Sequence, residues 1–345
     1  MVKKYLTFYS NLKTGAAALT ESPLKLTLAT WDHDRAEAIL DGQVGIEGCA
    51  LECSALPTTT LFPLAVDGAK FDITEMSLSS YIMQVSSGTS AYTAIPVFLS
   101  RAFRHSGFYV RTGSGIKTPK DLEGRTVGVP EYQMTAALWL RGILASEYGV
   151  VLSTIKYRTG GLDGGVRVER LPLDLPLGFV VQPMNEGENL NDLLLDGELD
   201  ALLAPKVPRA FLEKDPRIKR LFPDFADVER AYYKKTGFFP VMHTIGIRKT
   251  VLDENPWLAQ AVFNAFVEAR NLALKRLSDI WLGSANRISL PWMHETMEMT
   301  RDVMGEDYWS YGLEANWALI DWMCQQSVDQ YLAKTRLKPE DLFPV

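Results

Sequence analysis

The sequence predicts an α/β protein built of two lobes with a ligand cleft between them. Strand-like and helix-like patterns alternate through the first hundred residues, which is typical of βαβ units. The 345 residues are enough for two compact lobes, each with its own core. The pattern shifts near residues 103–110 and again near 239–244. We therefore expect a discontinuous first lobe, residues 1–106 and 242–345, and an inserted second lobe, residues 107–241.

The elements of the first lobe follow from hydrophobic periodicity. The glycine-punctuated, apolar stretch 41–56 reads as a hairpin-like segment, and the last hundred residues are mostly helical by pattern. The expected strands cover residues 24–30, 71–74, 95–99 and 244–247. The expected helices cover residues 34–40, 58–66, the stretch around Tyr81 and Met83, and 256–277.

Helix, turn and strand signals also follow one another in the inserted lobe. Residues 116–130 indicate a short helix, a turn and a strand, and residues 131–144 a strongly apolar helix. Residues 193–203 indicate a helix end, a glycine stop at Gly197 and a buried strand.

Charge and composition exclude several classes of protein. The net charge of −6 disfavours a nucleic-acid partner, and no basic amphipathic block indicates a membrane surface. Lys3 and Lys4 are not followed by an apolar core of signal-peptide length, so we expect a cytoplasmic protein. Three cysteines (Cys49, Cys53, Cys324) without metal spacing do not form a disulfide framework.

The most informative stretch is Trp31-Asp32-His33-Asp34-Arg35, directly after the strand at 24–30. In open α/β sheets, ligands bind beyond the carboxyl ends of the strands. The stretch therefore places proton-transfer and anion-binding groups where a ligand would lie. For Asp34, a role as N-cap of the next helix is an equal alternative.

Two segments resemble type II periplasmic-binding-protein folds. Residues 118–129, TPKDLEGRTVGV, are similar to a helix–turn–strand segment of that fold, and Asp196-Gly197-Glu198-Leu199-Asp200-Ala201 is similar to a second element. The resemblance implies the fold and says little about function.

Four further segments together resemble the 4,5-dihydroxyphthalate decarboxylase family, and the resemblance runs from about Leu24 to the C-terminus. The segments cover residues 31–35, 100–106, 237–244 and 311–316. The resemblance implies a carboxy-lyase of phthalate degradation, which converts 4,5-dihydroxyphthalate to protocatechuate and carbon dioxide without oxidation. It implies a small aromatic dicarboxylate as ligand and no organic cofactor. The segment from Asp163 to Gly178 departs from the family pattern, and we expect it to bear on which acid is bound.

Decarboxylation of an electron-rich ring needs a proton donor at the ring carbon and a base or acceptor at the hydroxyl para to it. Histidine suits either role because it titrates near neutrality. We expect His33 to donate the proton, oriented by Asp32 or Asp34, and His243 to act as the base. Glu75, at the end of a buried strand, is expected to accept a proton or a hydrogen bond from a ring hydroxyl.

Two of these assignments compete with structural roles, and the other two histidines have structural readings as well. His243 is equally compatible with a hinge residue bonded to backbone. The same reading is stronger for His105, and His294 is expected to be structural. Glu75 is alternatively an acidic residue at a helix start.

The retained carboxylate needs a cationic clamp, for which Arg35, Arg101 and Arg104 are the candidates. We expect at least one of the three to pair with a structural acid. Ser77 is expected to bind substrate, and Trp31 to stack on the ring unless it is a core residue. A helix start in the second lobe is expected to bind a carboxylate through free backbone N–H groups, at Tyr132, Gln133, Met134 and Thr135.

A divalent metal site is possible but not favoured. His33, His105 and His243 with Asp32 or Glu75 are the candidate ligands, but none shows local ligand spacing. We therefore predict no cofactor, with a divalent metal as the open alternative.

Two other functions remain open at this stage: a solute receptor for an aromatic acid, and a different decarboxylase or hydrolase using the same cleft. The aromatic C-terminal residues indicate either a homo-oligomer interface or packing on the first lobe. They are Tyr308, Trp309, Tyr311, Trp317 and Trp322.

Overall fold

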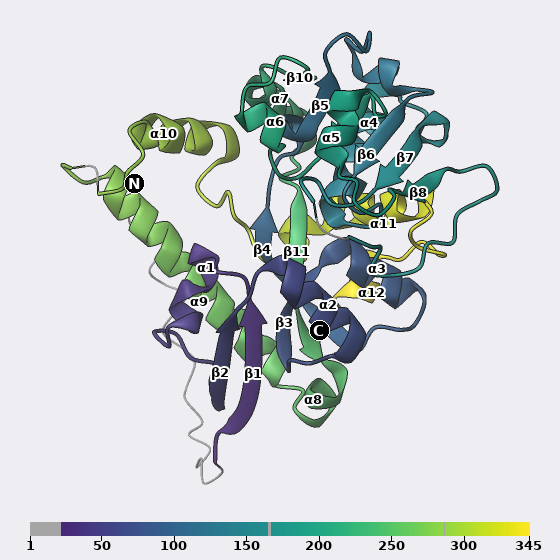
Figure 1. Cartoon of the computed structure of the whole chain (residues 1–345). Helices are drawn as coiled ribbons and strands as arrows, with labels where there is room; N and C mark the ends of the chain where they lie inside the picture. Colours follow the sequence, from purple (N-terminus) through teal and green to yellow (C-terminus); the bar gives the residue numbers. More distant parts are fainter. Residues whose placement is uncertain (1–21, 165–166, 286) are drawn as a thin grey trace.

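The computed structural model describes residues 22–164, 167–285 and 287–345 (Figure 1). The prediction made from Lys3 and Lys4 lies outside these residues. Within them, two β-sheets lie one above the other in Figure 1, each flanked by helices, as the predicted two-lobed α/β architecture requires. In this part of the chain, no helix is both long and apolar enough to cross a membrane.

The first sheet has five strands in the order β2-β1-β3-β11-β4. Strands β1, β2 and β3 are parallel, and β11 lies antiparallel between β3 and β4. The hairpin-like segment expected at 41–56 is wrong: β2 pairs in parallel with β1 because helix α1 carries the chain back across the sheet. The bounds are β1 (Leu24–Thr30), α1 (Asp34–Leu40), β2 (Cys49–Ala55), β3 (Ile73–Ser77), β4 (Tyr92–Arg101) and β11 (Val241–Arg248).

The second sheet has six strands in the order β10-β5-β9-β6-β7-β8, all between residues 108 and 220. A 3-10 turn at His105–Gly107 carries the chain into it from β4. A Cβ atom on Gly107 would lie 2.7 Å from the carbonyl oxygen of Ala204, so only glycine fits this passage. The bounds are β5 (Phe108–Arg111), β6 (Thr126–Val129), β7 (Lys156–Thr159), β8 (Val181–Pro183), β9 (Ala201–Leu203) and β10 (Ile218–Arg220).

The longer helices cover both lobes. They are α2 (Thr58–Gly68), α3 (Leu78–Ser86), α4 (Thr135–Tyr148), α7 (Phe225–Thr236), α9 (Leu258–Trp281), α10 (Met293–Met304) and α11 (Trp317–Asp329). Short helices complete the set: α5 (Leu190–Asp196), α6 (Arg209–Leu212), α8 (Lys249–Glu254) and α12 (Pro339–Leu342). The exact lobe limits at 106/107 and 241/242 stay predictions.

The C-terminal helices are expected to belong to the first lobe, but helix α11 contacts both lobes. It packs against α3 of the first lobe and α4 of the second. Trp322 stacks on Trp139 with ring centroids 4.4 Å apart, and the indole N–H of Trp309 donates to the carbonyl of Phe98. These aromatic residues therefore pack within the chain, and a homo-oligomer stays a prediction.

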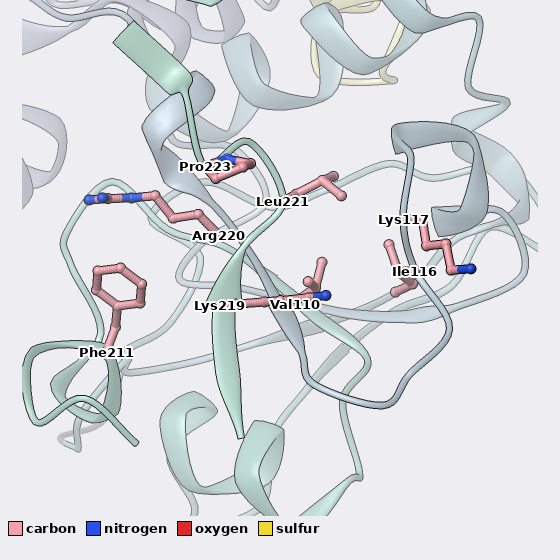
Figure 2. Close-up of a pocket in the computed structure, with 8 residues that line it drawn as sticks. All are labelled: Val110, Ile116, Lys117, Phe211, Lys219, Arg220, Leu221 and Pro223. Carbon is pink, nitrogen blue, oxygen red and sulfur yellow. The ribbon is translucent and has the colours of Figure 1, made fainter. Parts of the chain in front are cut away.

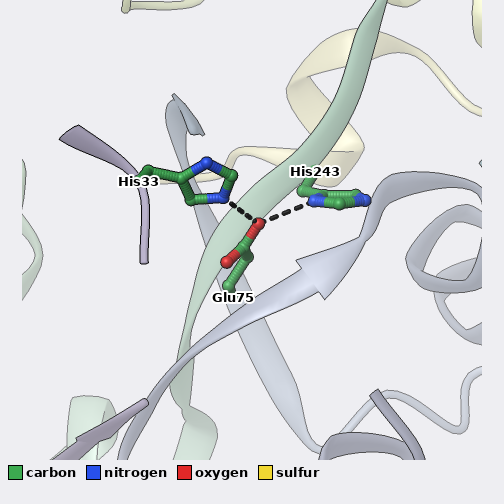
Figure 3. Close-up of side chains that lie close together, drawn as sticks. All are labelled: His33, Glu75 and His243. Atoms are coloured by element: carbon green, nitrogen blue, oxygen red, sulfur yellow. Dashed lines mark hydrogen bonds and ion pairs between the residues drawn. The ribbon is translucent and has the colours of Figure 1, made fainter. Parts of the chain in front are cut away.

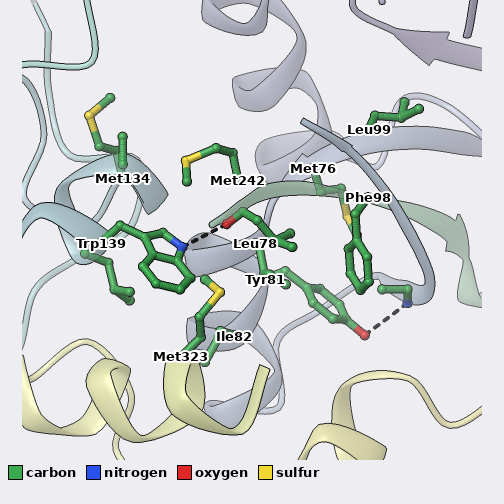
Figure 4. Close-up of a cluster of buried hydrophobic side chains, with 14 of the residues drawn as sticks. Met76, Leu78, Tyr81, Ile82, Phe98, Leu99, Met134, Trp139, Met242 and Met323 are labelled. Carbon is green, nitrogen blue, oxygen red and sulfur yellow. Dashed lines mark hydrogen bonds between the residues drawn. The ribbon is translucent and has the colours of Figure 1, made fainter. Parts of the chain in front are cut away.

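A continuous apolar core joins the two lobes (Figure 4). Leu78 and Ile82 of α3 share it with Trp139 of α4 and Met323 of α11. The indole N–H of Trp139 donates to the carbonyl of Val241 at 2.9 Å. This core fixes the ends of β3 and β11 against the start of α4, and the candidate site lies where these three ends meet.

Candidate active site

Glu75 is the centre of the site, and it is fully buried on β3. Its Oε1 lies 2.6 Å from Nδ1 of His243 and 2.8 Å from Nε2 of His33 (Figure 3). Its Oε2 accepts the backbone N–H of Trp31 at 2.7 Å. Burial acts to raise the pKa of Glu75, but the hydrogen bonds from His243 and His33 outweigh it and hold that pKa far below its usual range. Glu75 is therefore ionised, and both histidines must donate to it.

His33 lies directly before α1 and uses both ring nitrogens within the protein. Nε2 donates to Glu75, and Nδ1 accepts from Nη2 of Arg35 at 3.1 Å, because a guanidinium can only donate. His33 is also absent from the described lining of the cleft. This placement does not fit the role of ring-proton donor.

The predicted partners of His33 need correction too. Asp32 is exposed, and Asp34 pairs with Arg35 instead. Glu75 and Arg35 orient the imidazole, so Glu75 serves the histidines and is not free to meet a substrate hydroxyl.

His243 lies on β11 between β3 and β4. The register of β11 against β4 shifts on both sides of it, and such irregularities are common next to active sites. Nδ1 carries the hydrogen donated to Glu75, so Nε2, on the opposite side of the ring, is the basic nitrogen (Figure 3). Phe62 packs edge-on against the ring at 4.8 Å. The side chain bonds to Glu75, which argues against the alternative of a histidine held by backbone.

Burial lowers the pKa of His243 below its ordinary value, although Glu75 acts in the opposite direction. His243 is therefore neutral at pH 7. It lines the cleft between the lobes, which has a volume of about 270 Å³. An oriented, neutral imidazole thus meets a cavity of a size suited to one small molecule.

Residues from both lobes line this cleft. Six of the predicted site residues are among them: Trp31, Ser77, Arg104, Met134, Thr135 and His243. The other lining residues were not assigned from the sequence, and they include Thr58, Thr59, Phe62, Ser100, Arg167, Arg170 and Lys206.

The cleft is cationic. Arg104, Arg167, Arg170 and Lys206 line it, and none of its described lining residues is acidic. Burial lowers the pKa of Arg104 to about 10, which leaves it charged at neutral pH. Its Nε is buried without a hydrogen-bond partner in the described part of the chain. Such a cleft suits an anion with more than one negative charge.

Arg35 and Arg101, the other two predicted clamp residues, serve the fold. Arg35 donates to the carbonyl of Leu99 at 2.8 and 3.0 Å and pairs with Asp34, which confirms that one of the three binds a structural acid. Arg101 donates to backbone carbonyls of two residues and to Oδ1 of Asn316. Neither lines the cleft, so their prediction as substrate ligands is wrong.

The predicted anion site at the start of α4 is partly filled by the protein itself. The N–H groups of Tyr132 and Gln133 donate to the carboxylate of Glu169 at 2.5 and 3.1 Å. Met134 and Thr135 face the cleft, where the hydroxyls of Thr135 and Ser77 lie 2.9 Å apart. The prediction is therefore wrong for Tyr132 and Gln133, because the carboxylate of Glu169 already accepts their backbone N–H groups.

His33, Glu75 and His243 also offer three ligand atoms within 4.8 Å of one another, and two imidazoles with a carboxylate suit divalent transition metals. His105 and Asp32 are not part of this group. The guanidinium of Arg35 against His33 places a positive charge beside it, which opposes a further cation. His105 is instead buried among aromatic rings, and His294 is exposed on α10.

A larger hollow of about 500 Å³ lies along β10 in the inserted lobe (Figure 2). Its lining includes Lys117, Lys219 and Arg220 but none of the predicted site residues. The interlobe cleft, with its histidine–carboxylate centre, is therefore the candidate active site.

The fold and the site define a protein of the periplasmic-binding-protein-like class in which an oriented histidine faces a cationic interlobe cleft. A periplasmic sulfonate-binding protein from Methylobacillus flagellatus has the same fold, with a TM-score of 0.56 at 13% identity, over 94% of this chain and 92% of that one. The aliphatic sulphonate binding protein of Escherichia coli gives a TM-score of 0.54, also at 13% identity, over 93% of this chain and 98% of that one. These likenesses confirm the predicted fold.

The chain belongs to the 4,5-dihydroxyphthalate decarboxylase family, as its sequence segments indicated. It is 40% identical to the 4,5-dihydroxyphthalate decarboxylase of Comamonas testosteroni over 322 residues, which is 93% of this chain and 97% of that protein. It is 36% identical over 215 residues to the protein of the same name from Pseudomonas putida, over 62% of this chain and 83% of that protein. No protein-family model matches the chain.

Proposed function

We propose that this protein removes one carboxylate from 4,5-dihydroxyphthalate and releases protocatechuate and carbon dioxide. The observation that carries the proposal is the neutral His243, held by the ionised Glu75 and open to a cationic cleft in a member of this decarboxylase family. The two carboxylates of this substrate can bind the cationic side chains of the cleft, and one of its hydroxyls can give a proton to His243.

His243 acts as the base in this proposal, and His33 acts as a positioning residue. Nε2 of His243 takes the proton of the hydroxyl para to the departing carboxylate, and Glu75 stabilises the imidazolium that forms. The phenolate oxygen then raises the electron density at the ring carbon that bears this carboxylate.

That ring carbon takes up a proton derived from water, and its bond to the carboxylate breaks. The electron pair of the broken bond returns to the ring and restores its aromaticity, while carbon dioxide leaves. The imidazolium returns its proton to the phenolate, so the net reaction consumes one proton. Phe62, Met134 and Met242 give the cleft apolar surface, beside which the loss of a charged carboxylate is favoured.

Purified protein mixed with 4,5-dihydroxyphthalate tests the proposal through the ultraviolet spectrum, with protocatechuate as the standard. We expect conversion by wild-type protein and by His294→Ala, whose substituted residue is exposed on α10. Tight binding with an unchanged spectrum would instead identify a receptor.

The proposed chemistry requires only proton transfer, so we expect turnover to survive exhaustive treatment with a chelator. Loss of turnover that added divalent metal restores would assign the group of His33, Glu75 and His243 to a metal.

A further inference from the structure

The connection between β7 and β8 brings two arginines to the cleft. We call its residues 167–171 the strap. Arg167 and Arg170 both line the cleft, and the strap lies within the segment that we expect to depart from the family pattern. The strap lies against the residues that precede α4 and is bound to them by side-chain hydrogen bonds.

Three charged side chains of the strap bind three consecutive residues before α4. Nε of Arg167 and Nε of Arg170 donate to the two carboxylate oxygens of Glu131, at 2.6 and 2.7 Å. The carboxylate of Glu169 accepts the N–H groups at 132 and 133. Glu131 is almost fully buried, with 4% of its side chain exposed. We call the pair of hydrogen bonds from Arg167 and Arg170 to Glu131 the clasp. The clasp fixes each guanidinium group along the edge that carries Nε.

The other edge of each guanidinium is available to a ligand. The hydrogen bonds found for Arg167 and Arg170 in the described part of the chain use Nε, and none uses an Nη atom. Arg170 also lies over the ring of Phe62 at 5.3 Å, and Phe62 packs against His243. Arg170 is therefore one side chain away from the proposed base.

Two adjacent guanidinium groups that share one carboxylate keep a net positive charge. Two neighbouring carboxylates on one ring can each take paired Nη donors from such a pair. A ring with a single carboxylate leaves one of these positions without its anion, which weakens its binding relative to the dicarboxylate.

We propose that Arg167 and Arg170 are the specificity-determining residues that select an aromatic ring with two adjacent carboxylates over a ring with one. The proposal rests on the proposed function for the identity of the substrate. It also accounts for release of a monocarboxylate product from a site that binds the dicarboxylate.

The test measures equilibrium binding of unreactive phthalate and of benzoate by calorimetry, using Arg167→Gln, Arg170→Gln and the double variant. We expect wild-type protein to prefer phthalate, and the double variant to lose about tenfold or more of that preference. With 4,5-dihydroxyphthalate, KM should rise about tenfold while kcat changes less than about threefold, because the lost contacts bind substrate and transition state alike. Arg209→Gln, an exposed arginine paired with Asp192, is the matched control.

Thermal unfolding of each variant separates a binding defect from a folding defect. Where a glutamine variant unfolds early, the lysine variants replace it, and an intermediate preference is expected because charge remains without the planar fork. An unchanged preference, or an equal loss for phthalate and benzoate, would overturn the proposal.

The two proposals fail in different ways. A wild-type protein without turnover, whose phthalate preference still depends on the two arginines, would overturn the proposed function alone. Turnover by wild-type protein, with a preference for phthalate over benzoate that is unchanged in the Arg167 and Arg170 variants, would overturn this inference alone.

Discussion

Nδ1 of His243 lies 2.6 Å from Oε1 of Glu75, and this contact decides which imidazole nitrogen meets the cleft. Because the buried carboxylate can only accept, the hydrogen stays on Nδ1 and Nε2 stays basic. His33 approaches the same oxygen from the other side at 2.8 Å, with Arg35 behind it. The four side chains form one hydrogen-bonded row, and only its His243 end lines the cleft.

Replacing Glu75 by glutamine should lower kcat about 10²- to 10⁴-fold with little change in KM, because the amide no longer fixes the tautomer or stabilises the imidazolium. Steady-state kinetics with 4,5-dihydroxyphthalate measure this effect. Glu52→Gln, at an exposed position of the same sheet, is the matched control. Full activity in Glu75→Gln would remove the carboxylate from the mechanism.

The pH dependence of kcat/KM should report the lowered pKa of His243. The base works only when neutral, so kcat/KM should rise with pH and level off, with a midpoint below the ordinary histidine value of about 6.5. Since Glu75 raises the pKa of His243, the midpoint should move lower still in Glu75→Gln. A midpoint above the ordinary value in wild-type protein would contradict the assignment.

His105→Phe should make the protein less sensitive to acid. Burial lowers the pKa of His105 to about 4, and its Nδ1 has no partner in the described part of the chain. As pH falls from about 6.5 to about 4, His105 is protonated in the unfolded chain but stays neutral in the folded protein. This difference lowers the free energy of unfolding by about 3 kcal/mol.

Urea unfolding at pH 7 and pH 4 measures this loss in wild-type protein and in His105→Phe. We expect the loss to be smaller by about 3 kcal/mol in the variant. His294→Phe, at an exposed histidine, should keep the wild-type loss. Equal losses in all three proteins would show that His105 does not titrate in this way.

The sequence predicted much of the fold because hydrophobic periodicity is local information. The strand at 24–30 and the glycine stop at Gly197 are found where the patterns placed them. Strand pairing is not local information, so the pattern of residues 41–56 indicates a hairpin although β2 pairs in parallel with β1. Helix α11 likewise contacts both lobes through packing that no single segment reveals.

The candidate site divides in the same way. The sequence indicated the ends of β1, β3 and β11, where His33, Glu75 and His243 are found together. It could not distinguish Arg104, which reaches the cleft, from Arg101, three residues earlier, which binds backbone carbonyls. It also missed Arg167 and Arg170, since their place depends on a clasp with Glu131 from a distant segment.

The most direct measurement of the central claim compares kcat in two variants that each keep one contact with Glu75. Asparagine at 243 keeps a donor near the place of Nδ1 but lacks Nε2, and glutamine at 33 keeps a donor near the place of Nε2. We predict that His243→Asn lowers kcat about 10²- to 10⁴-fold and that His33→Gln lowers it less than about tenfold. A large loss in His33→Gln with near-normal turnover in His243→Asn would contradict the account.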